Sequence, residues 1–84
     1  MKYTLLFDRQ FKADLAKLDK SLRDRILRKV FQLDKYPEIG KHLIGIDLWS
    51  LRIGKYRVLY TIRENKLQIL ILSVHHRKKA YEKM

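Results

Sequence analysis

Leu48-Trp-Ser-Leu-Arg-Ile-Gly-Lys-Tyr-Arg-Val-Leu-Tyr60 is the stretch that decides the fold of this chain. Two runs rich in β-branched and aromatic residues flank Gly54-Lys55, a two-residue connection with glycine first, which is typical of a tight β-hairpin. Such a turn also sets the register of the two strands and gives the hairpin one apolar face. The predicted cross-strand pairs are Ile53 with Tyr56, Arg52 with Arg57, Leu51 with Val58, and Trp49 with Tyr60.

The same register places Arg52 directly beside Arg57 on the second face of the hairpin. Like charges opposite each other on a sheet destabilise it by about 0.2–1 kcal/mol. A phosphate over the pair would remove this cost, because a guanidinium fork matches phosphate oxygens in a bidentate fashion. Two interpretations stay open from these residues: an anion site, or two arginines that splay outward or pair with acidic residues elsewhere.

The first half of the chain predicts a strand and two helices. In residues 2–7, Tyr3, Leu5 and Phe7 alternate with Thr4 and Leu6, as the two faces of a strand do. Asp8 then offers a cap for an amphipathic helix from Arg9 to about Leu18. Asp19 and Ser21 both offer caps for a second helix, which Tyr36-Pro37 ends. Two helices joined so closely form a hairpin that buries its apolar stripes on the sheet.

The second half predicts a loop and a three-stranded antiparallel meander. Residues 39–47 read as a connecting loop in which Lys41 and His42 are solvated. The hairpin follows, and a turn around Glu64-Asn65 leads into a last strand, residues 67–74. By regular alternation, the core face receives Leu67, Ile69, Ile71, Ser73 and His75. The face bearing the two arginines receives Gln68, Leu70, Leu72, Val74 and His76. The predicted fold class is α+β, a single domain over residues 1–84 with both helices packed on one sheet face.

Composition narrows the function. The 84 residues carry a formal charge of +11, no cysteine, and three histidines without metal-ligand spacing, so neither a metal site nor a cysteine nucleophile is predicted. Residues 1–47 have a balance of +4 and residues 48–84 a balance of +7. Such an excess favours polyanionic partners: nucleic acid, the ribosome or an acidic protein, with a membrane surface less favoured. No apolar run is long enough for a membrane span and the start lacks a signal peptide, so a cytoplasmic protein is expected.

Residues 48–60, followed by Ser73-Val-His-His-Arg-Lys-Lys-Ala-Tyr81, resemble the RelE/ParE superfamily of toxin–antitoxin toxins. The family pattern is an Arg-x-Gly-x-Tyr-Arg core, then a strand, a His-Arg pair and a nearby tyrosine. The resemblance spans the whole chain. It implies a RelE-like fold and, for the RelE branch, a ribosome-dependent endoribonuclease that cleaves mRNA in the A site. The 2′-hydroxyl attacks the adjacent phosphate without a metal or other cofactor. ParE-like toxins share the fold but inhibit DNA gyrase.

The resemblance assigns Arg57 and Arg77 to the scissile phosphate, and Tyr81 to base stacking or proton transfer. The alternative role of Tyr81, and the less favoured one, is that of a packing residue of the tail. Some RelE-like toxins carry lysines at the positions of Leu48 and Ser50, and their absence here leaves the general base open. The predicted replacement is His76, which the alternation places on the face of Arg57; an ordinary backbone hydrogen bond is its alternative role.

Further positively charged residues are predicted to hold RNA rather than to cleave it. These RNA-binding candidates are Arg52, Lys55, Lys78 and Lys79. An apolar strip on the same face suits a cognate acidic, RelB-like antitoxin that folds on binding and forms a hetero-oligomer with the toxin. The predicted antitoxin-binding residues are Leu59, Leu70, Leu72 and Val74. A gyrase inhibitor and a non-catalytic RNA-binding module remain the alternative functions.

Overall fold

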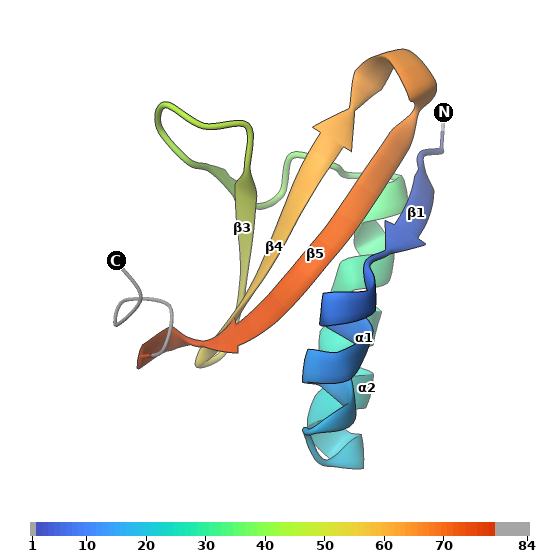
Figure 1. Ribbon diagram of the computed structural model, residues 1–84. Coiled ribbons are helices and arrows are strands. Elements are labelled where there is room, and N and C mark those ends of the chain that lie inside the picture. Colours follow the sequence, from blue (N-terminus) through green and yellow to red (C-terminus); the bar gives the residue numbers. More distant parts are fainter. Residues whose placement is uncertain (1, 79–84) are drawn as a thin grey trace.

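Two aspartates fix where the helices begin. The computed structural model (Figure 1), which describes residues 2–78, places α1 at Arg9–Ala16 and α2 at Lys20–Val30. The Asp8 carboxylate accepts from the Gln10 amide at 2.8 Å, and that of Asp19 accepts from the Leu22 amide at 2.8 Å. Each carboxylate satisfies an amide that has no partner within its helix. Of the two caps offered for the second helix, the chain uses Asp19.

The α-helical part of the second helix is shorter than predicted. It ends at Val30 and continues as one 3₁₀ turn, η1, over Phe31–Asp34. The chain thereby leaves the helical conformation before Pro37, as the restriction on the residue preceding proline requires.

The strands form one mixed sheet. In chain order they are β1 (Thr4–Phe7), β2 (Lys41–His42), β3 (Trp49–Ile53), β4 (Tyr56–Arg63) and β5 (Gln68–His76), with a short 3₁₀ turn, η2 (Glu64–Lys66), before β5. Their order in the sheet is β1-β5-β4-β3-β2; β1 runs parallel to β5 and the other neighbours are antiparallel. The α+β fold and the hairpin register are confirmed. The short strand β2 lies where a loop was predicted.

The core lies between the sheet and the two helices, which both lie on the same side of the sheet (Figure 1). The helical layer supplies Phe11, Ile26, Val30 and Leu33, and the sheet supplies Leu51, Ile53, Val58, Tyr60, Ile69, Ile71 and Val74. Burial of these side chains is the main favourable term for an 84-residue chain. The opposite face of the sheet, which α1 and α2 leave uncovered, is called the helix-free face below.

Tyr60 links the sheet to the segment that leads into β2. Its side chain is fully buried, its hydroxyl donates to the Pro37 carbonyl at 2.8 Å, and it accepts from the Gly40 amide at 3.1 Å. Burial raises the pKa of Tyr60 to about 12. A Cβ at Gly40 would lie 2.6 Å from the Tyr60 hydroxyl, so glycine is required there for this close approach.

An irregularity in β5 changes the predicted faces of its last residues. Tyr60 pairs with Ile71, but Leu59 pairs with Ser73, so Leu72 is one extra residue between two ladder pairs. A β-bulge of this kind shifts the alternation of every residue that follows it. The first part of β5 therefore obeys the predicted alternation, and the last part does not.

No helix within residues 2–78 has both the length and the apolar character needed to span a bilayer.

Candidate nucleic-acid interface

Three positively charged or titratable side chains stand in one row across the helix-free face. Arg52 pairs with Arg57, and Arg57 pairs with His75, so the three residues are direct neighbours on β3, β4 and β5. Arg52 is exposed, whereas Arg57 and His75 are half-buried. We call Arg52, Arg57 and His75 the basic row.

The bulge exchanges the two histidines relative to the sequence prediction. His76 was predicted on the face of Arg57 and His75 on the core face, and both placements are wrong. His76 pairs with Tyr56, and the two rings meet edge to face with centroids 5.2 Å apart. The Lys78 amide donates to Nδ1 of His76 at 3.2 Å. His76 therefore has the alternative role considered for it, a hydrogen bond to the backbone.

The turn of the hairpin brings further positively charged residues to the end of the basic row. The Arg77 amide donates to the Lys55 carbonyl at 2.7 Å, which holds the chain after β5 against the turn. Arg52 Nε makes a long contact of 3.5 Å with the Gly54 carbonyl. Arg77, Lys78 and Lys55 are all exposed, so the structure places three predicted phosphate contacts beside the basic row. Tyr81 and Lys79 lie outside the described residues.

Lys41 is a residue of this face that sequence reasoning missed. It was predicted as a solvated loop residue, but it pairs with Ser50 in the antiparallel β2–β3 ladder. Ser50 in turn pairs with Leu59, and both lie one row from Arg52 and Arg57 on the same face. Lys41 thus adds a positively charged residue beside Ser50 on this face. A two-residue strand has too short a pattern to be found by periodicity.

An apolar strip crosses the helix-free face between the basic row and the far end of the sheet. Leu6 pairs with Leu70, which pairs with Thr61, and Leu59 follows in the next row toward the basic row. Leu6 is 39% exposed; it joins this surface because β1 pairs with β5, which the sequence did not indicate. The predicted place of Val74 on the antitoxin surface is wrong. Val74 is 5% exposed and belongs to the core, because the bulge turns its side chain toward the helices.

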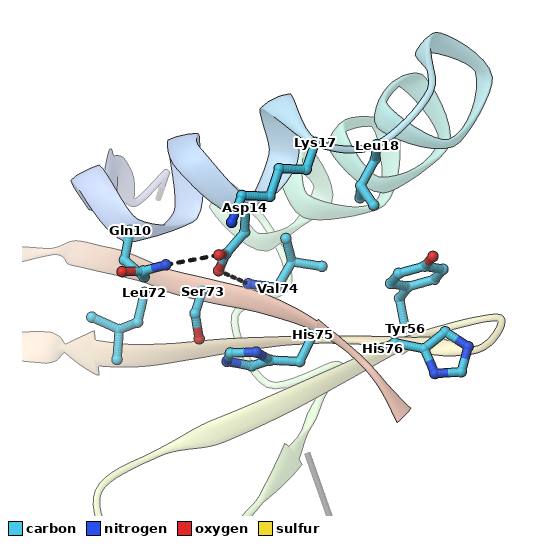
Figure 2. A pocket seen from close by; sticks show the side chains of 10 residues that line it. All are labelled: Gln10, Asp14, Lys17, Leu18, Tyr56, Leu72, Ser73, Val74, His75 and His76. Carbon is cyan, nitrogen blue, oxygen red and sulfur yellow. Dashed lines mark hydrogen bonds between the residues drawn. The ribbon is translucent and has the colours of Figure 1, made fainter. Parts of the chain in front are cut away.

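A groove of about 650 Å³ runs along the free edge of β5, where β1 has ended (Figure 2). Asp14 of α1 lines this groove. Oδ2 of Asp14 accepts from the Val74 amide at 3.2 Å, and Oδ1 of Asp14 accepts from Gln10 Nε2 at 2.7 Å. Figure 2 shows Val74 toward the helical layer and His75 on the other side of the strand. Asp14 thus satisfies an edge amide one residue before His75 and fixes this part of β5 to α1.

Comparisons with known proteins place this arrangement in a family. A family model described as the ParE toxin of the type II toxin–antitoxin system parDE matches residues 5–81. No curated protein sequence matches the chain.

Solved structures agree in fold over nearly the whole chain. The toxin in the RelBE2 toxin–antitoxin complex from Mycobacterium tuberculosis is 32% identical, with a TM-score of 0.84, over 92% of this chain and 100% of that one. The archaeal RelE–RelB complex from Pyrococcus horikoshii gives 29% identity and a TM-score of 0.76 over 92% and 97%. Isolated RelE toxin from Escherichia coli gives 25% identity and a TM-score of 0.78 over 96% and 93%.

Proposed function

The chain belongs to the RelE/ParE superfamily of type II toxins, and we propose that it is a ribosome-dependent endoribonuclease that cleaves mRNA in the A site. As a member of that family it is the toxin of a toxin–antitoxin pair. The observation that carries the RNase proposal is the basic row, in which two guanidinium groups and an imidazole lie side by side on the helix-free face. Cleavage of mRNA would inhibit translation, in the cytoplasm.

The chemistry of the proposed reaction requires three functions. A base takes the proton of the 2′-hydroxyl, whose oxygen attacks phosphorus; the bond to the 5′-oxygen breaks, and that oxygen takes up a proton. The products are a 2′,3′-cyclic phosphate and a free 5′-hydroxyl. Positive charge must stabilise the extra negative charge that gathers on the phosphate oxygens in the transition state. Acid–base groups contribute most when they titrate near the working pH.

The basic row offers groups for these functions. We assign charge stabilisation to Arg57, with Arg52 beside it and Arg77 reaching the same end of the sheet. His75 takes the place predicted for His76 as proposed base, because it is His75 that stands directly opposite Arg57. An imidazole nitrogen can accept a proton or donate one, so this side chain can serve as base or acid.

Neighbouring residues are proposed to position the substrate. Lys41, one row away, would supply the charge that is missing at Ser50. Lys55 and Lys78 are exposed beside the turn and suit phosphate contacts that orient the strand. Lys79 and Tyr81 keep the roles that the resemblance implies, a phosphate contact for Lys79 and base stacking or proton transfer for Tyr81.

The antitoxin partner is proposed from the solved relatives, which are toxin–antitoxin complexes. An acidic, RelB-like chain would complement the formal charge of +11. Its apolar contacts would fall on the revised strip of Leu6, Leu59, Leu70 and Leu72, which are half-buried or exposed on or beside the helix-free face. Val74 is excluded from this strip by its burial.

The test is cleavage of a defined mRNA in a translating extract. Arg57→Ala should lower the rate by about 10²–10³-fold, the usual cost of one group that stabilises transition-state charge. Arg63→Ala is the matched control: it removes the same charge from the same strand and face, at the far end, where Arg63 pairs with Gln68. Lys41→Ala should slow mRNA cleavage moderately, because it removes a charge proposed to position the substrate. Lys35→Ala is its control and should leave the rate of cleavage unchanged. Intact mRNA in an extract whose translation has stopped would refute the proposal.

Inhibition of DNA gyrase is the second candidate, because the family model that matches residues 5–81 is that of ParE. Expression without antitoxin would then cause DNA breaks and a damage response while translation continues. Harmless expression would instead favour a non-catalytic RNA-binding member of the family.

A further inference from the structure

Arg25 reaches from the helical layer to the tip of the β3–β4 hairpin. A Cβ placed on Gly54 would lie 3.2 Å from Nη2 and 3.3 Å from Nη1 of Arg25. The guanidinium of this exposed α2 residue therefore lies against the turn. Gly54 has a φ of +59°, in the left-handed region, so glycine both permits the turn and leaves space for Arg25.

The turn thus gathers positive charge from separate elements. Arg52 of β3 contacts the Gly54 carbonyl, the Arg77 amide donates to the Lys55 carbonyl, and Lys55 is itself exposed at the tip. Arg25 adds a guanidinium from the side of the sheet opposite to the basic row. The positive surface therefore continues from the helix-free face, around the Gly54–Lys55 turn, to α2.

The sequence of α2 leaves Arg25 without a neutralising neighbour on its own helix. Side chains three or four positions apart are the ones that meet on a helix surface. For Arg25 these positions hold Ser21, Leu22, Arg28 and Lys29, none of which is acidic. No acidic side chain three or four positions away on α2 therefore competes with an external anion for Arg25.

We propose that Arg25 and Lys55 form a second phosphate subsite, which holds a phosphodiester of the RNA strand next to the one bound at the basic row. This inference rests on the proposed function and deepens it by giving the path of the substrate: the strand passes around the hairpin turn. Two phosphates held on either side of the turn fix the direction of the strand. The subsite reads the backbone and not the bases, so it positions RNA without selecting a sequence.

The test measures binding of a short fluorescein-labelled single-stranded RNA to the purified full-length toxin at several salt concentrations. Each phosphate contact in a single-stranded complex contributes about 0.7 to the slope of log K against log salt. Arg25→Ala should lower the affinity at low salt and reduce the slope by about 0.7, whereas Arg25→Lys should keep the slope. Arg28→Ala is the control, since this exposed arginine of α2 lies near Phe31 and Tyr36, away from the turn.

Equal slopes for Arg25→Ala and Arg28→Ala would overturn the subsite, as would the absence of salt-dependent RNA binding by the unaltered protein. Melting curves confirm folding of each variant, and Arg25→Gln, which keeps most of the side-chain stem, serves if the alanine variant unfolds. A different result would refute the proposed function. The unaltered toxin would then leave mRNA intact on translating ribosomes, whatever the salt dependence of RNA binding is.

Discussion

The two halves of β5 differ in what surrounds them. Gln68–Ile71 lies between two strands, paired with β1 on one side and β4 on the other in regular register. Ser73–His76 follows the bulge, pairs with β4 alone, and has its free edge held by Asp14. The first half supports the core. The second half presents His75 beside Arg57, so within β5 the candidate chemistry lies where pairing is less complete.

The difference indicates that one half of β5 mainly stabilises the core and the other half positions His75. The first half, paired on both sides, carries Ile69 and Ile71 of the core. A bulge at the end of that support re-aims the following side chains at small cost to the core. Substitutions at Ile69 and Ile71 should therefore change stability, and substitution of His75 should change activity.

The largest effect is expected at the two histidines. His75→Ala should slow mRNA cleavage on ribosomes by about 10²–10⁴-fold, because it removes the proposed base next to Arg57. His76→Ala, which loses a ring contact and a backbone hydrogen bond, should keep most of the activity once folded protein is matched. Single-turnover cleavage rates of the two variants decide which histidine is the base. The opposite ranking would place His76 at the reaction and contradict the observed register.

The next effect is on stability in the first half of β5. Ile69 is fully buried, so Ile69→Ala should lower the free energy of unfolding by about 2–5 kcal/mol. Leu72→Ala, at the half-buried bulge, should lower the free energy of unfolding by clearly less. Urea unfolding curves measure both. Similar losses for the two variants would show that the bulge contributes as much to stability as the regular part of the strand.

A smaller effect is expected at the link between α1 and the free edge. Asp14→Ala removes the acceptor of the Val74 amide, which should cost about 1–3 kcal/mol locally. Asp14→Asn keeps an acceptor oxygen and should restore most of this. Hydrogen exchange should speed up at Val74 in the alanine variant and stay unchanged at Ile69. Faster exchange at both amides would mean that the strand opens as one unit.

The smallest effect concerns the ionisation of Tyr60, next to the bulge, and changes stability with pH only in the alkaline range. Its pKa is raised from 10.0 to about 12 by burial, so folding favours the protonated hydroxyl. This contribution to stability is complete below pH 10 and is lost as the pH rises from 10.0 through about 12. Tyr60→Phe should lower stability at neutral pH and flatten the alkaline decline, as melting temperatures across this range will show. If the alkaline decline in melting temperature is the same in Tyr60→Phe as in the unaltered protein, other titrating groups cause that decline.

The sequence predicted the parts of the fold that depend on local patterns. The Gly54-Lys55 turn set the β3–β4 register, and the caps at Asp8 and Asp19 set the helix starts. The parts that it could not predict depend on contacts between distant residues. The bulge at Leu72, the parallel pairing of β1 with β5, and the pairing of Lys41 with Ser50 have no local signal.

The candidate site shows the same limit more sharply. Arg52 and Arg57 were placed together correctly because one tight turn joins their strands. One unanticipated residue between Ile71 and Ser73 was enough to exchange His75 with His76 and to move Val74 into the core. Regular alternation is a sound rule within a strand, but it propagates a single error to the end of it.

The measurement that tests the central claim most directly compares two mRNAs on purified ribosomes. One is unmodified, and the other has a single 2′-deoxy nucleotide just before the scissile phosphate. Attack by the 2′-hydroxyl on a phosphate held at the basic row predicts rapid cleavage of the first, with a cyclic phosphate end, and none of the second. Equal cleavage of both, or of neither, would contradict the account.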